Sequence, residues 1–172
     1  KEWTNNGGTL IATGNAYRLT NKAKITDFKL LSSEKEDEKS KGNASIEYRP
    51  YHSTEKASAG IDGVIFNCTL DITSPLGYGY SHPEVAVLKN GATVMDFSQI
   101  KGNSPMHYTK QPYLSGCVSQ KNINRIANSP AALVPKSGKG NVIWFADDLN
   151  YRSYWFGGTK IFMNAVYFGQ LY

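Results

Sequence analysis

The alternation of apolar and polar residues along the chain predicts short strands separated by helices. Alternating or continuous apolar runs, bounded by turn residues, indicate strands at residues 9–13, 63–71, 84–88, 131–135 and 141–146. Helical spacing indicates helices at residues 16–23, 119–127 and 156–168. Ser119 is placed to cap the second of these helices. Strands that alternate with helices in this way predict an α/β fold.

The last strand and the last helix are the most apolar elements. Residues 142–146 are apolar throughout, which is typical of a central strand in a mainly parallel sheet, buried on both faces. In the helix at 156–168, Lys160, Asn164 and Tyr167 form one stripe and apolar residues fill the other faces. We therefore expect this helix to pack against the sheet over most of its surface.

Three further segments complete the predicted organisation. Lys89-Asn-Gly91 predicts a hairpin turn that pairs residues 84–88 with 92–97, as an addition to the sheet. Residues 32–60 are polar and charged, which predicts an insertion or mobile loop with a strand near 45–48. Residues 1–8 have the pattern of a helix end closed by Asn-Gly. We expect residues 1–172 to form a single domain, truncated at its start, from the C-terminal part of a larger protein.

Composition and charge narrow the classes of partner. Apolar residues make up 40% of the chain and charged residues 19%, as in an ordinary globular domain. The net charge is +5, but basic and acidic residues are interleaved at 34–41, so no basic surface for a nucleic acid is predicted. No apolar run reaches the roughly 18 residues that a membrane-spanning helix needs.

Cysteine and histidine residues offer few metal-binding patterns. Cys68 and Cys117 match no zinc-binding spacing, and they could either pair or remain free thiols. His52-Ser-Thr-Glu55 has the spacing of two zinc ligands, which His82 or His107 would have to complete. Because that segment is polar and loop-like, we interpret the spacing as coincidental and predict no metal site.

A possible catalytic group lies around His82-Pro-Glu84, which resembles the His-Pro-Glu of class I glutamine amidotransferases. In those enzymes the histidine activates a cysteine thiol. Cys68 lies upstream without elbow glycines, and Cys117 lies downstream in Ser-Gly-Cys-Val-Ser. The alternative catalytic group is therefore Cys117, His82 and Glu84, although the sequence does not assemble a complete triad.

The last strand is preceded by a glycine-containing segment and followed by a polar, acidic one. Gly138-Lys-Gly140 is too short for a phosphate-binding loop and is interpreted as a turn. The strand is followed by four polar residues, Asp147, Asp148, Asn150 and Arg152. Ligands of open α/β sheets bind beyond the carboxyl ends of strands, so these four are the candidate binding residues. Alternatively they form a structural joint, in which Asp148 or Asn150 caps a helical turn and Arg152 pairs with Asp147.

In their order, three motifs resemble one family. They are Gly7-Gly-Thr-Leu-Ile-Ala-Thr-Gly14, Asp71-Ile-Thr-Ser-Pro-Leu-Gly-Tyr-Gly-Tyr80 and the segment 138–165, which includes Asp148, Asn150, Arg152 and Trp155. Together they resemble the C-terminal, class I glutamine amidotransferase-like domain of exported bacterial zinc carboxypeptidase-like proteins. Ser74 stands where that family often has a histidine.

The resemblance implies a partial flavodoxin- or amidotransferase-like three-layer sandwich. It also implies that the zinc-dependent peptidase domain lies upstream, with its zinc, and that the parent protein is exported. A degenerate triad would make this segment a non-catalytic accessory that supports the peptidase domain or binds peptide or glycan. The alternatives are a cysteine-dependent amidotransferase-like hydrolase and a small-ligand-binding module.

Overall fold

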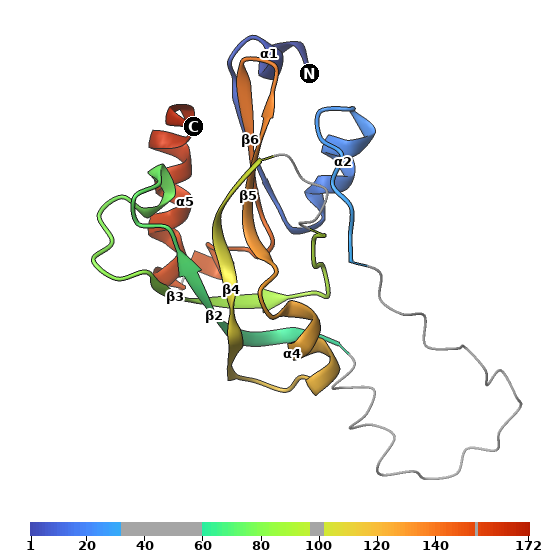
Figure 1. Ribbon diagram of the computed structural model, residues 1–172, viewed down its shortest axis with the longest axis vertical. Helices are drawn as coiled ribbons and strands as arrows, with labels where there is room; N and C mark the ends of the chain where they lie inside the picture. The colour runs from blue at the N-terminus through green and yellow to red at the C-terminus, as the bar shows by residue number, and fades with distance from the viewer. Residues whose placement is uncertain (32–59, 97–101, 154) are drawn as a thin grey trace, which may run out of the picture.

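The computed structural model describes residues 1–31, 60–96, 102–153 and 155–172, which form an α/β fold around one mixed sheet (Figure 1). The sheet curls into a half-barrel with the strand order β1-β6-β5-β4-β2-β3. The strands are β1 (Thr9–Thr13), β2 (Asp62–Leu70), β3 (Glu84–Asn90), β4 (Gly102–Ser115), β5 (Pro130–Ser137) and β6 (Gly140–Phe145). The α-helices are α1 (Glu2–Asn5), α2 (Tyr17–Lys22), α4 (Gln120–Ile126) and α5 (Phe156–Phe168). Short 3-10 turns are η1 (Gly14–Ala16), η2 (Pro75–Gly77), η3 (Tyr151–Ser153) and η4 (Gly169–Leu171).

Most of the predicted elements are confirmed within one or two residues of their expected ends. They include the three longer predicted helices and the strands that became β1, β2, β3, β5 and β6. The Ser119 hydroxyl accepts a hydrogen bond from the Asn122 backbone N–H, as expected of an N-cap. The start of the chain does form a helix end: α1 is a single turn, and Gly7 follows it with φ 113°. The predictions for residues 45–48, His52 and Glu55 lie outside the described residues.

The prediction of a mainly parallel, flavodoxin-like sheet is wrong. Among the strands of the described residues, the pair β1–β6 alone is parallel and the four other pairs are antiparallel. For β5 and β6 the reason is local, because a tight turn joins them with Ser137 paired to Gly140. Such a turn can connect only antiparallel neighbours. Gly138 occupies this turn with φ 63°, and a Cβ atom there would lie 2.6 Å from Asn5 Cα.

The predicted hairpin at Lys89-Asn-Gly91 is also wrong. β3 pairs with the preceding strand β2, from Asp62 opposite Asn90 to Thr69 opposite Glu84. After Gly91 the chain leaves the sheet, and Met95 forms an isolated bridge with Leu30 instead. Gly91 has φ 101°, so the glycine does make a turn, but the turn leads to a different partner.

Strand β4 was not predicted, although it is the longest strand and lies between β5 and β2. It contains Pro105 and Pro112, which interrupt the regular alternation of a strand. Its pairing with both neighbours is broken by register shifts, for example between Asn103 and Met106. These irregularities accommodate the prolines and conceal the strand from pattern analysis.

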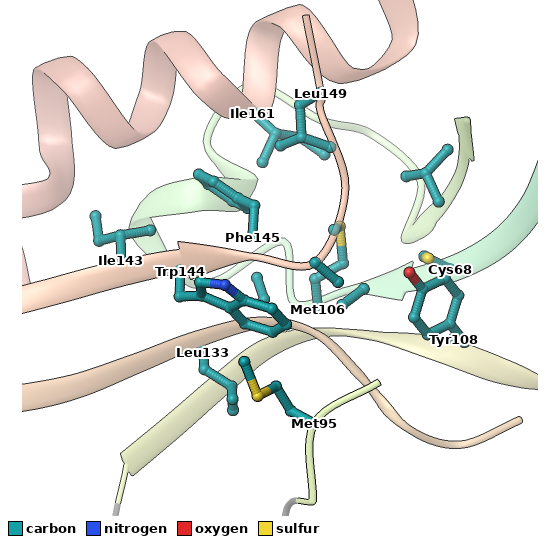
Figure 2. Packing of buried hydrophobic residues seen from close by; sticks show 14 of the residues in the cluster. Cys68, Met95, Met106, Tyr108, Leu133, Ile143, Trp144, Phe145, Leu149 and Ile161 are labelled. Carbon is teal, nitrogen blue, oxygen red and sulfur yellow. The ribbon is translucent and has the colours of Figure 1, made fainter. Parts of the chain in front are cut away.

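The core lies on both sides of β6, whose residues are all buried. Figure 2 shows Phe145 on the side of α5, near Ile161 and Leu149, and Trp144 on the other side. There the Trp144 ring lies 5.7 Å from that of Phe28, which comes from the segment after α2. The two-sided burial inferred from the apolar run is therefore correct. Its cause is cover by α5 and by the Phe28 segment, not a parallel sheet.

Candidate functional site

The most unusual group of side chains is a buried cluster of Lys89, Tyr108 and Asp147. Lys89 Nζ lies 3.0 Å from Asp147 Oδ1 and donates a second hydrogen bond of 3.0 Å to the Tyr108 hydroxyl. That hydroxyl in turn donates to Asp147 Oδ2 at 2.5 Å. The three groups thus form a closed ring of hydrogen bonds.

Each member of the cluster comes from a different part of the sheet. Lys89 lies near the end of β3 and Tyr108 in β4, and Asp147 lies two residues after the end of β6. Because β3 and β6 are separated by β2, β4 and β5 in the strand order, the ion pair spans the inside of the curl. Alternation along β3 places Lys89 on the same face as the buried Val85 and Val87.

The cluster is sealed from solvent. The side chains of Lys89 and Asp147 are 0% and 1% exposed, and Tyr108 is buried as well. Charges so far from water persist only when they are paired and fully hydrogen-bonded. Removing either partner would leave an uncompensated charge in the core.

Burial shifts the acid–base behaviour of the groups next to the carboxylate. The pKa of Tyr108 is raised well above its usual value, first by burial and then by the negative charge of Asp147. Tyr108 therefore stays protonated and available as a donor. Cys68 is paired opposite Tyr108 in the sheet, and its pKa is also raised, mainly by burial and then by Asp147. A neutral, buried thiol is a poor nucleophile.

The four predicted binding residues do not form one site. Asp147 is buried in the cluster, whereas Asp148, Asn150 and Arg152 are exposed. Asp148 accepts a hydrogen bond from the Asn150 backbone N–H, and Asn150 accepts one from Thr159. The expected Arg152–Asp147 pair is not formed, because Lys89 already neutralises Asp147 and the Arg152 guanidinium lies over the Tyr151 ring.

The alternative catalytic residues are also dispersed. His82 and Glu84 are exposed where β3 begins, beside the end of β2, since Pro83 accepts a hydrogen bond from Leu70. Cys117 is exposed just beyond β4, whose last residue pairs with Ile65. At about 3.3 Å per residue, Ile65 and Leu70 lie roughly 16 Å apart. The structure therefore brings neither Cys117 nor the buried Cys68 to His82.

Lys89 and Tyr108 are the functional candidates that the sequence pattern did not reveal. Lys89 belonged to a Lys-Asn-Gly turn, where a lysine is normally solvated. The sequence does contain one indication that Lys89 is buried. Lys89 lies two residues after Val87 and four after Val85, so all three side chains point to the same face of the strand. Tyr108 lies in the strand that was not predicted. Among the described residues, no three His, Cys, Asp or Glu side chains are grouped to hold a metal ion.

A second feature is the outward face of α5, which is apolar. It consists of Phe156, Met163, Val166 and Tyr167, with Leu171 of η4 beyond the helix, and is called here the α5 face. Phe156 is 82% and Tyr167 63% exposed. At a helix edge, Phe168 contacts Tyr78 with ring centroids 5.5 Å apart, so the apolar surface continues onto the loop after η2.

The orientation of α5 explains why this face is exposed. Asn164 is buried, and its amide donates to the backbone carbonyls of Leu76 and Tyr78 at 2.9 Å each. Lys160 lies over the Tyr80 ring, 4.7 Å from its centroid, and donates to the Gly79 carbonyl. Two members of the expected polar stripe, Lys160 and Asn164, therefore bind the loop at 76–80, whereas the third, Tyr167, faces solvent. The prediction that α5 packs over most of its surface is wrong, because the residues of the α5 face are exposed.

The comparisons with known proteins do not assign a family. The chain matches no family model, no curated protein and no solved structure. In the described part of the chain, no helix has the length and apolar character needed to cross a bilayer.

Proposed function

We propose that this chain is a non-catalytic accessory module that docks to a folded protein domain through the α5 face. The observation that carries the proposal is that α5 is apolar on both sides: Ile161 and Ala165 face the core with Asn164, and a second apolar stripe faces outward. Exposed apolar surfaces of this kind mark interaction sites in folded proteins. An amphipathic helix presented in this way fits an apolar groove on a partner.

The chemistry of the α5 face favours a protein as the occupant. Helices that lie on membranes carry many Lys and Arg residues beside their apolar face, whereas Lys160 is the one charged residue of α5 and is committed to the loop at Gly79. Small ligands bind in concave sites that enclose them, whereas the α5 face is the outside of a helix. An apolar groove on another protein domain needs neither basic residues on the helix nor a concave site in this chain, so it fits the α5 face.

The dispersal of the candidate catalytic groups supports a non-catalytic role. Asp147 is enclosed with Lys89, and Cys68 is buried with a raised pKa. Cys117 and His82 lie beside opposite ends of β2. Nucleophilic catalysis needs a nucleophile and a base within hydrogen-bond reach.

The sequence resemblance to exported zinc carboxypeptidase-like proteins suggests which domain the partner is. On that basis the partner is the zinc carboxypeptidase-like domain that precedes this segment in an exported parent protein. The zinc chemistry then belongs to the partner domain, and this chain contributes the docking surface.

The test measures binding of the purified chain to the domain encoded immediately upstream in its gene, by calorimetry. Val166→Lys should weaken binding at least tenfold, because a charge would enter the apolar contact. Leu19→Lys is the matched control, since Leu19 is an exposed apolar residue on α2, away from the α5 face, and it should leave the affinity unchanged. The purified chain alone should release no C-terminal residues from peptides.

Three results would contradict the proposal. One is binding that Val166→Lys does not change, and another is an upstream region that encodes no folded domain. The third is a dimer in sedimentation experiments that Val166→Lys dissociates, which would make a second copy of this chain the occupant.

A further inference from the structure

The cluster of Lys89, Tyr108 and Asp147 holds an amine against a carboxyl group, with a phenol linking the two. Lys89 Nζ is 3.0 Å from Asp147 Oδ1, and the Tyr108 hydroxyl accepts from Nζ while it donates to Asp147 Oδ2. We propose that this cluster is a self-modification site, at which Lys89 and Asp147 condense to form an isopeptide bond.

The proposed step balances without any other reactant. The Cγ–Nζ bond forms and the Cγ–Oδ2 bond of Asp147 breaks. Of the three protons on the Lys89 ammonium, two pass to Oδ2, which leaves as water, and one remains on the new amide. Tyr108 provides the route for these protons, because its oxygen accepts from Nζ and its O–H donates to Oδ2.

The surroundings of the cluster favour this reaction over a permanent ion pair. The hydrogen bonds through Tyr108 give a proton a route from the Lys89 ammonium to the Asp147 carboxylate, which frees the Nζ lone pair for attack. Two buried charges, each unfavourable to desolvate, are replaced by one neutral amide. Groups held in contact react as if at very high concentration, about 10⁵–10⁸ M in favourable cases.

Water and competing nucleophiles are excluded from the cluster. The side chains of Lys89 and Asp147 are 0% and 1% exposed, so little water reaches the bond to hydrolyse it. Cys68 lies opposite Tyr108, but its raised pKa keeps the thiol neutral and unreactive. The condensation therefore has one amine and one activated carboxyl group.

The bond would change how the fold resists force and proteolysis. It joins β3, at one edge of the sheet, to the end of β6 across the curl. A covalent link at this place prevents β3 from separating, and unlike a disulfide it is insensitive to reducing agents. This inference is independent of the proposed docking function, since the cluster is buried and the α5 face is exposed.

The test is the intact mass of the purified, folded chain after incubation at neutral pH. The expected mass is lower than the sequence mass by one water molecule. Proteolytic digestion should yield one branched peptide that joins the segment of Lys89 to that of Asp147. A folded chain that keeps its full sequence mass would overturn the proposal.

Two variants locate the reaction. Lys89→Met should keep the full mass of its sequence, because the amine is absent. Tyr108→Phe should slow the loss of water at least a hundredfold, which is the lower end of the range for general acid–base catalysis. Circular dichroism establishes that both variants are folded. A succinimide at Asp62–Gly63 would also release one water, so a mass loss that persists in Lys89→Met contradicts the proposal. Condensation of Tyr108→Phe at the wild-type rate would exclude Tyr108 as the relay.

Discussion

The buried cluster and the α5 face distribute polar and apolar side chains in opposite ways. In the cluster, a charged lysine and aspartate lie in the core, and every polar group there has a partner within the chain. On the α5 face, large apolar side chains such as Phe156 and Tyr167 lie in solvent. The cluster is therefore complete within this chain, whereas the α5 face gains its stabilisation only when another surface covers it. The first region bears on stability and the second on binding.

The largest expected effect is that of Asp147→Ala on the free energy of unfolding. The variant removes the partner of the buried Lys89, and with it the proposed cross-link, which should cost at least about 3–5 kcal/mol. Urea denaturation measures the change, with Asp148→Ala as the matched control. Asp148 is exposed and accepts one hydrogen bond, from the Asn150 N–H, so its loss should cost no more than about 1.5 kcal/mol. Equal effects of the two variants would show that the cluster does not hold the sheet together.

A smaller loss is expected when the anchor of α5 is removed. Asn164→Ala deletes the two hydrogen bonds to the carbonyls of Leu76 and Tyr78, which should cost about 1–3 kcal/mol. Met163→Ala changes the neighbouring exposed residue and should cost much less. Thermal unfolding of both variants distinguishes the inward from the outward face of the helix, and a reversed order would mean that α5 is rotated.

Alkaline pH should lower the free energy of unfolding by an amount comparable to, or smaller than, the effect of Asn164→Ala. The pKa values of Cys68 and Tyr108 are raised in the folded protein, so the unfolded chain loses these protons first. The contribution of Cys68 is complete below the ordinary thiol pKa of about 8.5 and that of Tyr108 below the ordinary phenol pKa of about 10. Each is lost as the pH rises above that value, by about 1.4 kcal/mol per pH unit. Urea denaturation at a series of pH values measures the slope. Cys68→Ala should reduce the slope just above the thiol pKa, and an unchanged slope would contradict the assignment.

The smallest effect is expected on the α5 face. Val166→Lys alters an exposed side chain, so the free energy of unfolding should change by less than about 0.5 kcal/mol. The same variant is expected to impair binding to the partner domain, which separates the two roles of the helix. A loss of several kcal/mol would mean that Val166 contributes to the core.

Local pattern was sufficient for most elements and insufficient for the sheet. The helix at 119–127 and its Ser119 cap were predictable because the contacts that form them lie a few residues apart. Strand β4 was not, since Pro105 and Pro112 break the alternation and its bulged pairing depends on strands distant in sequence. The direction of the strands depended on the turn between β5 and β6, which was identified as a turn but not related to sheet topology.

The α/β class, the ends of most elements and the two-sided burial of β6 could be inferred from the sequence, because they follow from residue periodicity. Which residues meet across the sheet depends on long-range packing. Asp147 could have paired with Arg152, which is close in sequence, but the curl of the sheet places Lys89 of β3 next to Asp147, and these two residues form the ion pair. Asn164 could have faced solvent, but the backbone carbonyls of Leu76 and Tyr78 accept hydrogen bonds from its amide and hold it inward. Periodicity specifies a face, and long-range packing specifies what that face contacts.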